Sequence, residues 1–376
     1  MTLHVSSAFD GGNIEVRDLS RLDDVRLAIR PDHGSDHFQW FCFRAVGGRG
    51  QDLTMVIENA GDASFTSGWK DYRACASYDL EEWFRVPTSY RDGELVIEHR
   101  PERDTCTYAY FAPYSLERHR SLVAKAASRA RVSVVGRSVD GRDIDLIQIG
   151  EPAESRHPCW IIARQHPGET MAEWLAEGLL HRLLDEADPV TRELRRRAVF
   201  YVVPNMNPDG GFRGHLRVNA VGANLNREWA DPDPERCPEV FAVRAEMERT
   251  GVRFFLDVHG DEGLPYNFVV GPSPTLTDVP TTIREAQQRY EKALVSASPD
   301  FQTKHGYPTS RTGKPDLRKA TNWVAHTHGA LAMTLEQPFK DTKDTPDARF
   351  GWSPPRCRHL GRACLDALHV VLDDLG

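Results

Sequence analysis

The stretch WIIARQHPGETMAEWLAEGLLHRLL (residues 160–184) joins two kinds of structure. It begins with an apolar run typical of a buried strand and ends with apolar residues at the i, i+3, i+4 spacing of a helix. Between the two lies a short turn in which Pro167 and Gly168 separate His166 from Glu169. This turn is either a polar connection or half of a metal site, and the rest of the chain has to distinguish the two.

Apolar runs and helical stretches alternate through the rest of the chain. The apolar runs read CWIIAR, AVFYVVP, FFLDVHG, NFVVGP and ALAMTLEQPF. The helical patterns cover residues 170–187, 234–250, 279–296 and 355–375. Strands that are apolar throughout are buried on both faces of a sheet. We therefore expect an α/β domain with a mixed, largely parallel central sheet covered by helices.

Residues 1–115 have a different pattern. Short alternating or apolar stretches recur there between turn signals, among them HFQWFCFRAV, DLTMVIENA, GELVIEHR and CTYAYFAPY. Such strands pack naturally as an antiparallel β-sandwich. A capped helix that starts at Ser115 marks the change of pattern. We therefore expect two domains, a β-sandwich over 1–115 and the α/β domain over 116–376.

The composition excludes several classes of protein. With 376 residues and a formal net charge of −8, the chain has room for two domains and is too acidic for a general nucleic-acid binder. No apolar run approaches the roughly 18 residues of a membrane span, and the N-terminus shows no signal peptide. The seven cysteines are scattered and form no CxxC pair, which favours buried free thiols in a reducing compartment. We expect a cytoplasmic protein with no nucleic-acid or membrane partner; the sequence leaves its oligomeric state open.

Metal-ligating residues directly follow two of the expected strands. His166 and Glu169 follow WIIAR, and His259 follows FFLDV. In open α/β sheets, functional side chains gather beyond the carboxyl ends of the strands. An HxxE pair is weak evidence alone, because about one arises by chance in a chain of this composition. With His259, however, the pair supplies the two His and one Glu that a catalytic zinc commonly binds, and Gly168 lets the turn bend.

The segment NMNPDGGFRGHLRVNAVGANLNREW (residues 205–229) contains strong turn formers, which alone predict a surface loop. It also contains Arg213, Arg217 and Arg227, with paired asparagines beside the last of them. Arginine binds a carboxylate through two parallel hydrogen bonds, and asparagine adds a directional donor. An anion-binding loop next to a metal site indicates a substrate with a free carboxylate near the reacting bond.

These motifs together resemble a known family. HPGE, NPDG, NLNR, DVHG and the late TLE occur in the order and spacing of the zinc metallocarboxypeptidases of the carboxypeptidase A kind. The HPGE form, the stretch YFAPYSLERH (residues 110–119) and the β-rich first domain are similar to the cytosolic carboxypeptidase subfamily. The resemblance covers the whole chain.

The resemblance implies a role for individual residues. The family's zinc ligands, for one Zn²⁺ per chain, match His166, Glu169 and His259. Glu336 matches the glutamate that acts as general base, and Arg217 matches the arginine that polarises the scissile carbonyl. Asn226 and Arg227 match the pair that holds the C-terminal carboxylate of the substrate.

Two positions depart from the family pattern or match it loosely. Asn224 stands where the family usually has an Asp that hydrogen-bonds the first zinc histidine. An amide oxygen can still accept that bond, but it makes the imidazole less basic. For the family's mobile tyrosine, Tyr307 is the best-placed candidate, and Tyr266 is the alternative.

The loop over residues 302–336 is expected to set specificity. It is basic within an acidic protein, with Lys304, Arg311, Lys314, Arg318 and Lys319. Such a run is often only a solvated face. Next to the site it favours an acidic C-terminal side chain, which Arg318 or Lys319 would contact. The cytosolic subfamily is known for removing C-terminal glutamates, so the resemblance implies deglutamylase-like hydrolysis of a C-terminal peptide or isopeptide bond of peptides or proteins.

Two other functions are compatible with part of the pattern. A zinc deacylase for small acylated amino acids would use the same ligands, but it would more often lack the NPDG and NLNR motifs and the first domain. A non-catalytic peptide-binding module would need a broken site, whereas all the ligands and the base are present.

Overall fold

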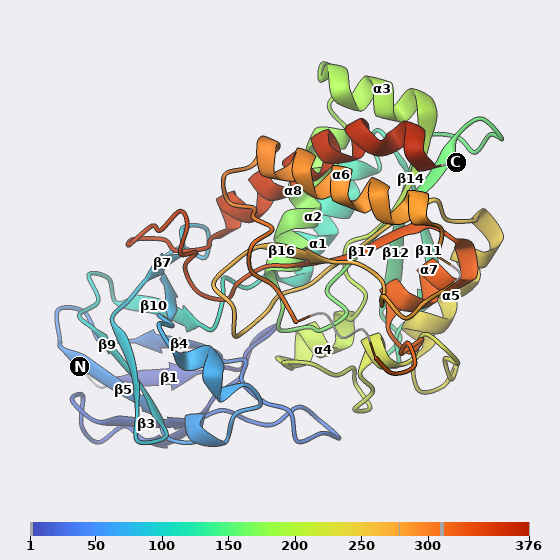
Figure 1. Ribbon diagram of the computed structural model, residues 1–376. Coiled ribbons are helices and arrows are strands. Elements are labelled where there is room, and N and C mark those ends of the chain that lie inside the picture. The colour runs from blue at the N-terminus through green and yellow to red at the C-terminus, as the bar shows by residue number, and fades with distance from the viewer. Residues whose placement is uncertain (1–2, 278, 309–311, 376) are drawn as a thin grey trace.

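The computed structural model describes residues 3–277, 279–308 and 312–375 (Figure 1). Its N-terminal part, from β1 to β10 (residues 4–109), contains two sheets and two short 3-10 helices. Its C-terminal part, from α1 onward (residues 116–375), contains a seven-stranded sheet with helices. Both parts of the predicted fold are therefore confirmed. Arg311, one of the basic residues of the expected specificity loop, lies outside the described residues.

The N-terminal part contains two five-stranded sheets. The first has the order β1 (His4–Ser6), β4 (Cys42–Val46), β10 (Thr105–Ala109), β6 (Cys75–Ser77) and β7 (Phe84–Arg85), and every pair is antiparallel. The second has the order β2 (Glu15–Asp18), β3 (Val25–Ala28), β5 (Leu53–Ile57), β9 (Glu94–His99) and β8 (Thr88–Arg91). In this sheet β3 and β5 are parallel, a pairing that the sequence did not predict. Two short 3-10 helices, η1 (Ala60–Asp62) and η2 (Thr66–Trp69), follow β5.

The central sheet of the C-terminal part is mixed. Its order is β11 (Arg131–Arg137), β12 (Asp143–Ile149), β14 (Ala198–Val203), β13 (His157–Ala163), β15 (Phe254–Val258), β17 (Leu331–Glu336) and β16 (Phe268–Val270). The four strands β14, β13, β15 and β17 are parallel, whereas β12 and β16 are antiparallel to their neighbours β14 and β17, and β11 is antiparallel to β12. The parallel strands therefore occupy the centre, where all residues of β14 and β15 are buried because both faces of the sheet are covered.

Helices surround this sheet. They are α1 (Leu116–Ala126), α2 (Met171–Leu183), α3 (Pro189–Arg197), α4 (Pro208–Arg213), η3 (Leu225–Arg227), α5 (Pro238–Thr250), α6 (Thr281–Ala297), α7 (Ala320–His328), α8 (Pro354–Val371) and η4 (Leu372–Leu375). Helix α8 packs against α2, α3 and α6, whereas α5 contacts β11 and α7 contacts β15 and β17. The predicted cap of α1 is confirmed, since the Ser115 side chain accepts a hydrogen bond from the Arg118 backbone N–H.

Three α-helices were not predicted, and one of them, α4, lies in the segment 205–229 that was expected to be a loop. Helix α3 consists largely of charged residues and buries only Thr191 and Leu194, so few apolar positions mark it in the sequence. It is started instead by Asp188, whose side chain accepts from the Thr191 N–H, and by Pro189 in the first turn. Helix α7 is short and was expected to be part of the specificity loop.

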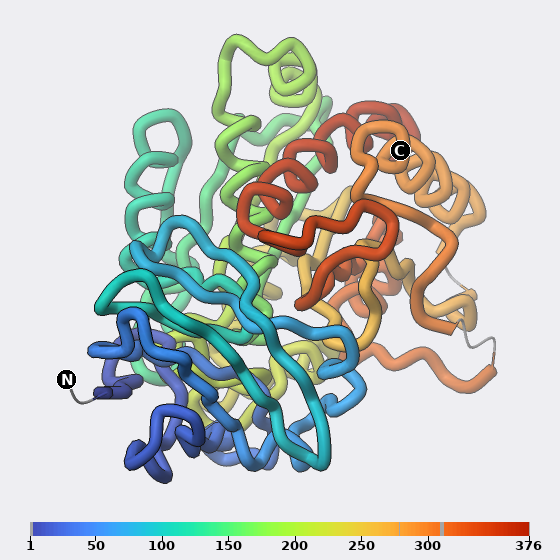
Figure 2. Tube along the Cα trace, turned by 90° about the vertical axis from the view of Figure 1, so that its left-hand side faces the viewer, coloured from blue at the N-terminus to red at the C-terminus, as the bar shows by residue number. Residues whose placement is uncertain are grey.

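The two parts of the molecule share one hydrophobic core. Figure 2 shows the N-terminal segments, in blue and cyan, packed against the rest of the chain. The rings of Tyr110 and Phe339 stack with centroids 4.4 Å apart, and Arg85 donates to the carbonyl oxygens of Phe339 and Trp352 at 2.9 and 3.0 Å. The N-terminal part is thus tied directly to the segment that follows β17.

The cysteines are as expected, and all seven are free and buried. In the part of the chain that the structure describes, no helix is long and apolar enough to cross a membrane.

Candidate metal centre and active site

The three expected metal ligands lie together at the carboxyl ends of two neighbouring parallel strands. His166 and Glu169 are in the turn between β13 and α2, and His259 directly follows β15. All three residues are buried, and their ligand atoms lie within 4.8 Å of one another. The carboxyl ends of adjacent parallel strands meet at the same edge of a sheet, which explains how residues 90 positions apart converge.

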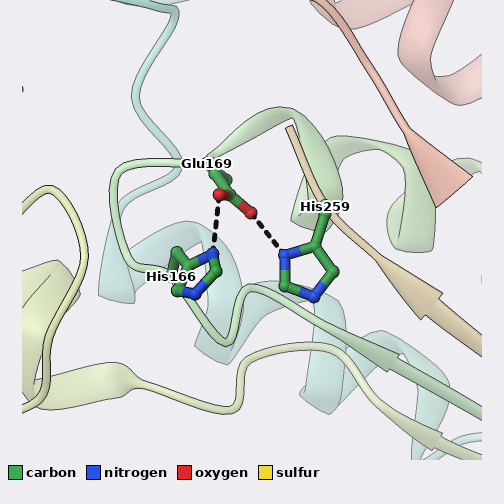
Figure 3. Close-up of side chains that lie close together, drawn as sticks. All are labelled: His166, Glu169 and His259. Atoms are coloured by element: carbon green, nitrogen blue, oxygen red, sulfur yellow. Dashed lines mark hydrogen bonds and ion pairs between the residues drawn. The ribbon is translucent and has the colours of Figure 1, made fainter. Parts of the chain in front are cut away.

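The Glu169 carboxylate lies between the two imidazole rings (Figure 3). Its oxygens are 2.7 Å from Nδ1 of His166 and 2.8 Å from Nδ1 of His259. Both Nδ1 atoms therefore face one point, where a metal ion would also contact the carboxylate. Two imidazole nitrogens and a carboxylate oxygen form a donor set that suits zinc.

Gly168 was expected to let the turn bend, but its role is to allow the close approach of another segment. Gly168 does not have a positive φ; instead its N–H donates to the Leu216 carbonyl at 2.9 Å, and a Cβ there would lie 2.9 Å from the same oxygen. The left-handed residue is Arg164, with a φ of 62°. Its guanidinium donates to the Pro167 carbonyl at 3.0 Å and so stabilises the turn.

The outer nitrogen of each histidine has an acceptor. Nε2 of His166 is 3.1 Å from Oδ1 of Asn224, and Nε2 of His259 is 2.9 Å from Oδ2 of Asp257. Gln165 donates to the same Asp257 oxygen at 2.7 Å. Such partners fix the orientation of metal-binding imidazoles. Asp257 was not predicted from the sequence, although the spacing DVH places Asp257 and His259 on the same face of a strand.

The charged groups of the centre and their burial shift one another's pKa values. Burial and the charge of Arg217 lower the pKa of His166 to about 4, so this imidazole is neutral at pH 7, the form that binds a metal. Burial alone would lower the pKa of His259, but the carboxylates of Asp257 and Glu169 raise it well above its ordinary value. Burial would raise the pKa of Glu169, and the two imidazoles instead lower it. A metal ion binding here would displace a proton from His259.

Glu336 is the last residue of β17, the next parallel strand beside β15. It lines the same cavity of about 1150 Å³ as the three expected ligands. Among the described residues, no group forms a hydrogen bond with its buried atom Oε2, and burial raises the pKa of this carboxyl group well above its ordinary value. The raised pKa makes Glu336 a stronger base than an exposed glutamate, so it is suited to accept a proton inside the cavity.

The loop that follows β14 brings Arg217, Asn226 and Arg227 into the lining of this cavity. Oδ1 of Asn226 accepts from the Ala320 N–H at 2.9 Å, and Nη1 of Arg227 donates to the Asn226 carbonyl at 2.6 Å. The guanidinium of Arg213, in contrast, binds Asp140 at 2.7 Å. Arg213 does not line the cavity.

The remaining predicted residues divide into two groups. Tyr307 lines the cavity, and its hydroxyl donates to Asp261 at 2.6 Å. Tyr266 does not line the cavity but stacks on His305, which does. Lys304, Lys314 and Lys319 also line the cavity. Arg318 does not line the cavity; its side chain is exposed, and its guanidinium pairs with Asp316 at 2.8 Å.

Comparison with known proteins agrees with this arrangement. Residues 117–359 match the family described as zinc carboxypeptidase, and residues 5–111 match the cytosolic carboxypeptidase N-terminal domain. The chain belongs to the zinc carboxypeptidase family. The predicted family and enzyme class, a metallocarboxypeptidase, are thereby confirmed.

Two solved structures are similar to this zinc carboxypeptidase over its whole length. A metallo-carboxypeptidase from Burkholderia cenocepacia is 46% identical with a TM-score of 0.96, and the alignment covers 99% of this chain and 100% of that one. A metallo-carboxypeptidase from Pseudomonas aeruginosa is 44% identical with a TM-score of 0.94, again over 99% and 100%. Cytosolic carboxypeptidase 6 of Mus musculus is 29% identical over 72% of this chain, which spans 55% of that protein.

Proposed function

We propose that this zinc carboxypeptidase removes acidic residues, glutamate above all, from the C-terminus of peptides or protein tails. The observation that carries the proposal is a cluster of cations, Arg217, Arg227 and Lys319, in the lining of the cavity that contains Glu336. Among the ion pairs of the described residues, none includes any of these three side chains.

The three cations act on one another. Burial and the charge of Arg217 lower the pKa of Arg227, and burial and the charge of Arg227 lower the pKa of Lys319. A ligand with two carboxylates would relieve this repulsion. A C-terminal glutamate has two, so we assign its α-carboxylate to Asn226 and Arg227 and its side chain to Lys319, which stands at the N-terminus of α7.

The same cavity accounts for the hydrolytic step. We assign zinc to His166, Glu169 and His259; when bound, zinc supplies a Lewis acid and an activated water. Glu336, with its raised pKa, would accept a proton and deliver it to the leaving amine. Arg217 would donate hydrogen bonds to the oxygen of the scissile carbonyl as negative charge develops there.

The P. aeruginosa relative was solved in complex with (2-guanidinoethylmercapto)succinic acid. That ligand has two carboxylates and one guanidinium, so it is compatible with a site for acidic or for basic side chains. The preference of this chain therefore has to be measured on matched substrates.

The test compares kcat/KM for three peptides that differ only in a C-terminal Glu, Lys or Phe. We expect the Glu peptide to be cleaved best. Replacing Lys319→Gln should lower its kcat/KM by about 10- to 100-fold, the value of a charged hydrogen bond, and should leave the Phe peptide unaffected. Glu336→Gln gives the background rate.

Arg318→Gln is the matched control, because Arg318 is adjacent in sequence but does not line the cavity. It should leave all three peptides unchanged. A loss confined to Arg318→Gln would assign the side-chain contact to Arg318 instead. Preferential cleavage of the Lys or Phe peptide would contradict the acidic preference, while the zinc carboxypeptidase assignment would stand.

A further inference from the structure

The N-terminal part of the chain reaches the active-site cavity. Phe65 and Ser67 line it together with the residues of the C-terminal part. The Arg217 guanidinium carbon lies 5.4 Å from the centre of the Phe65 ring, within the range of a cation–π contact. One side of Arg217 is therefore bounded by a residue of the N-terminal part.

A second residue of the N-terminal part holds the backbone of Arg217. The side chain of Asp32 is buried, with 2% of the residue exposed. Its carboxylate accepts hydrogen bonds from the N–H groups of Leu216, Arg217 and Val218 at 2.7, 2.7 and 3.2 Å. Three donors from consecutive residues on one carboxylate restrict the backbone of this segment, and bonds to a charged acceptor are stronger than neutral ones.

The residues that follow Asp32 also contact the chain around Arg217. The His33 N–H donates to Nε2 of His215, whose Nδ1 lies 3.0 Å from the Val218 carbonyl. A backbone N–H can only donate and a carbonyl can only accept, so these partners define a neutral imidazole with its proton on Nδ1. At Gly222 a Cβ would lie 2.4 Å from the Gly34 carbonyl, so the two backbones are in direct contact.

The held segment is also connected to the metal-binding turn. The Leu216 carbonyl accepts from Gly168, which lies between His166 and Glu169. Asp32, the segment 216–218 and the turn thus form one line of hydrogen bonds from the N-terminal part to the expected metal ligands.

We infer that Asp32 is a positioning residue for Arg217, and that the N-terminal part is in this way a component of the active site. The inference rests on the proposed role of Arg217 at the scissile carbonyl. A guanidinium aimed at a developing charge has to be held in place, because a displacement of about 1 Å can cost about 100-fold in rate. A buried carboxylate is costly unless its hydrogen bonds are made, and here it accepts them from the arginine that needs orientation and from the two residues beside it.

The test is a cycle of two substitutions with a glutamate-terminated peptide as substrate. Arg217→Gln should lower kcat by about 100- to 1000-fold, as the loss of an oxyanion donor does. Asp32→Asn keeps the shape but leaves one acceptor oxygen in place of two, and we expect kcat to fall by about tenfold with little change in KM. In the Arg217→Gln background, Asp32→Asn should have no further effect, because Asp32 then has nothing to position.

The matched control is Asp10→Asn. Asp10 is another carboxylate of the N-terminal part that accepts a backbone N–H across the same interface, from Leu116 at 2.7 Å, but it does not touch residues 216–218. It should cost stability without lowering kcat. If Asp32→Asn fails to fold, Phe65→Leu completes the same cycle, since it removes the ring beside the guanidinium.

The outcomes separate the inference from the proposed function. Wild-type kcat in Arg217→Gln would overturn the role of Arg217 itself. A large loss in Arg217→Gln, with a loss from Asp32→Asn that is absent or equal in both backgrounds, would overturn only the positioning role.

Discussion

At the scale of single residues, the two histidines of the proposed zinc site have different hydrogen-bond acceptors at Nε2. His259 has the carboxylate of Asp257 behind it, whereas His166 has the amide oxygen of Asn224. A carboxylate makes the imidazole a stronger base and a better ligand than a neutral amide does. Asn224 is also the position at which the chain departs from the pattern that the resemblance implies, so its effect can be measured.

We predict that Asn224→Asp tightens zinc binding by about tenfold, the lower end of the range for such partners. Asn224→Ala, which removes the acceptor, should weaken binding by a similar factor. Competition with a chelator of known affinity measures all three proteins. Equal affinities for the Asn and Asp forms would show that the partner of His166 does not limit binding.

At the scale of secondary structure elements, three of them meet in a buried charge network behind the metal-binding turn. His119 of α1 contacts Glu173 of α2 at 2.6 Å and Asp145 of β12 at 3.0 Å. Glu173 in turn accepts from Arg164, which holds the turn, at 2.8 Å. The conspicuous stretch YFAPYSLERH therefore includes, in His119, a residue that connects the start of the C-terminal part to the site.

This network predicts a pH dependence of stability. Burial alone would lower the pKa of His119, but Asp145 and Glu173 raise it to about 9 from its ordinary value of 6.5. A folded-state pKa above the unfolded value contributes stability that is complete below pH 6.5 and is lost as the pH rises through 9. The free energy of unfolding should therefore decline over this interval.

Denaturant titrations at a series of pH values check this prediction. His119→Gln should be less stable than the wild type below pH 6.5 and should lack that part of the decline. His4→Gln, at an exposed histidine of β1, is the control and should retain it. An unchanged decline in His119→Gln would assign the pH dependence to other groups.

At the scale of the whole molecule, the proposed zinc would connect segments that are distant in the chain. Two ligands follow β13, the third follows β15, and the turn between β13 and α2 is bonded through Leu216 to the segment that Asp32 holds. A ligand that binds only the folded chain stabilises it by mass action.

We therefore predict that removal of zinc by dialysis against a chelator lowers the midpoint of thermal unfolding, and that added zinc restores it. The stabilisation should reach about 4 kcal/mol at a free zinc concentration 1000 times the Kd. Differential scanning calorimetry measures the shift. Glu169→Gln, which lacks one ligand, should show no response to the chelator; a wild-type midpoint that ignores zinc would contradict the site.

The prediction of the fold succeeded where the signal is local. Strands β13, β14, β15 and β17 are continuous apolar runs, and α2, α5, α6 and α8 have the helical period, so their existence could be predicted. Helix α3 was missed because it is short and contains few apolar residues, so its period rests on too few positions to be recognised. The parallel pairing of β3 and β5 was missed because strand pairing depends on contacts between distant segments, which a local pattern does not contain.

The amino-acid sequence by itself determined the chemistry of the site: the ligand types at His166, Glu169 and His259, the carboxylate of Glu336, the arginines after β14 and the amide of Asn224. Each of these follows from a short motif placed at the end of a strand. Only the tertiary structure decided which other groups act on them. Asp32 meets the Arg217 segment across 185 positions, and Lys319 rather than Arg318 lines the cavity. Such contacts arise when separate segments pack together, so no motif within a single segment encodes them.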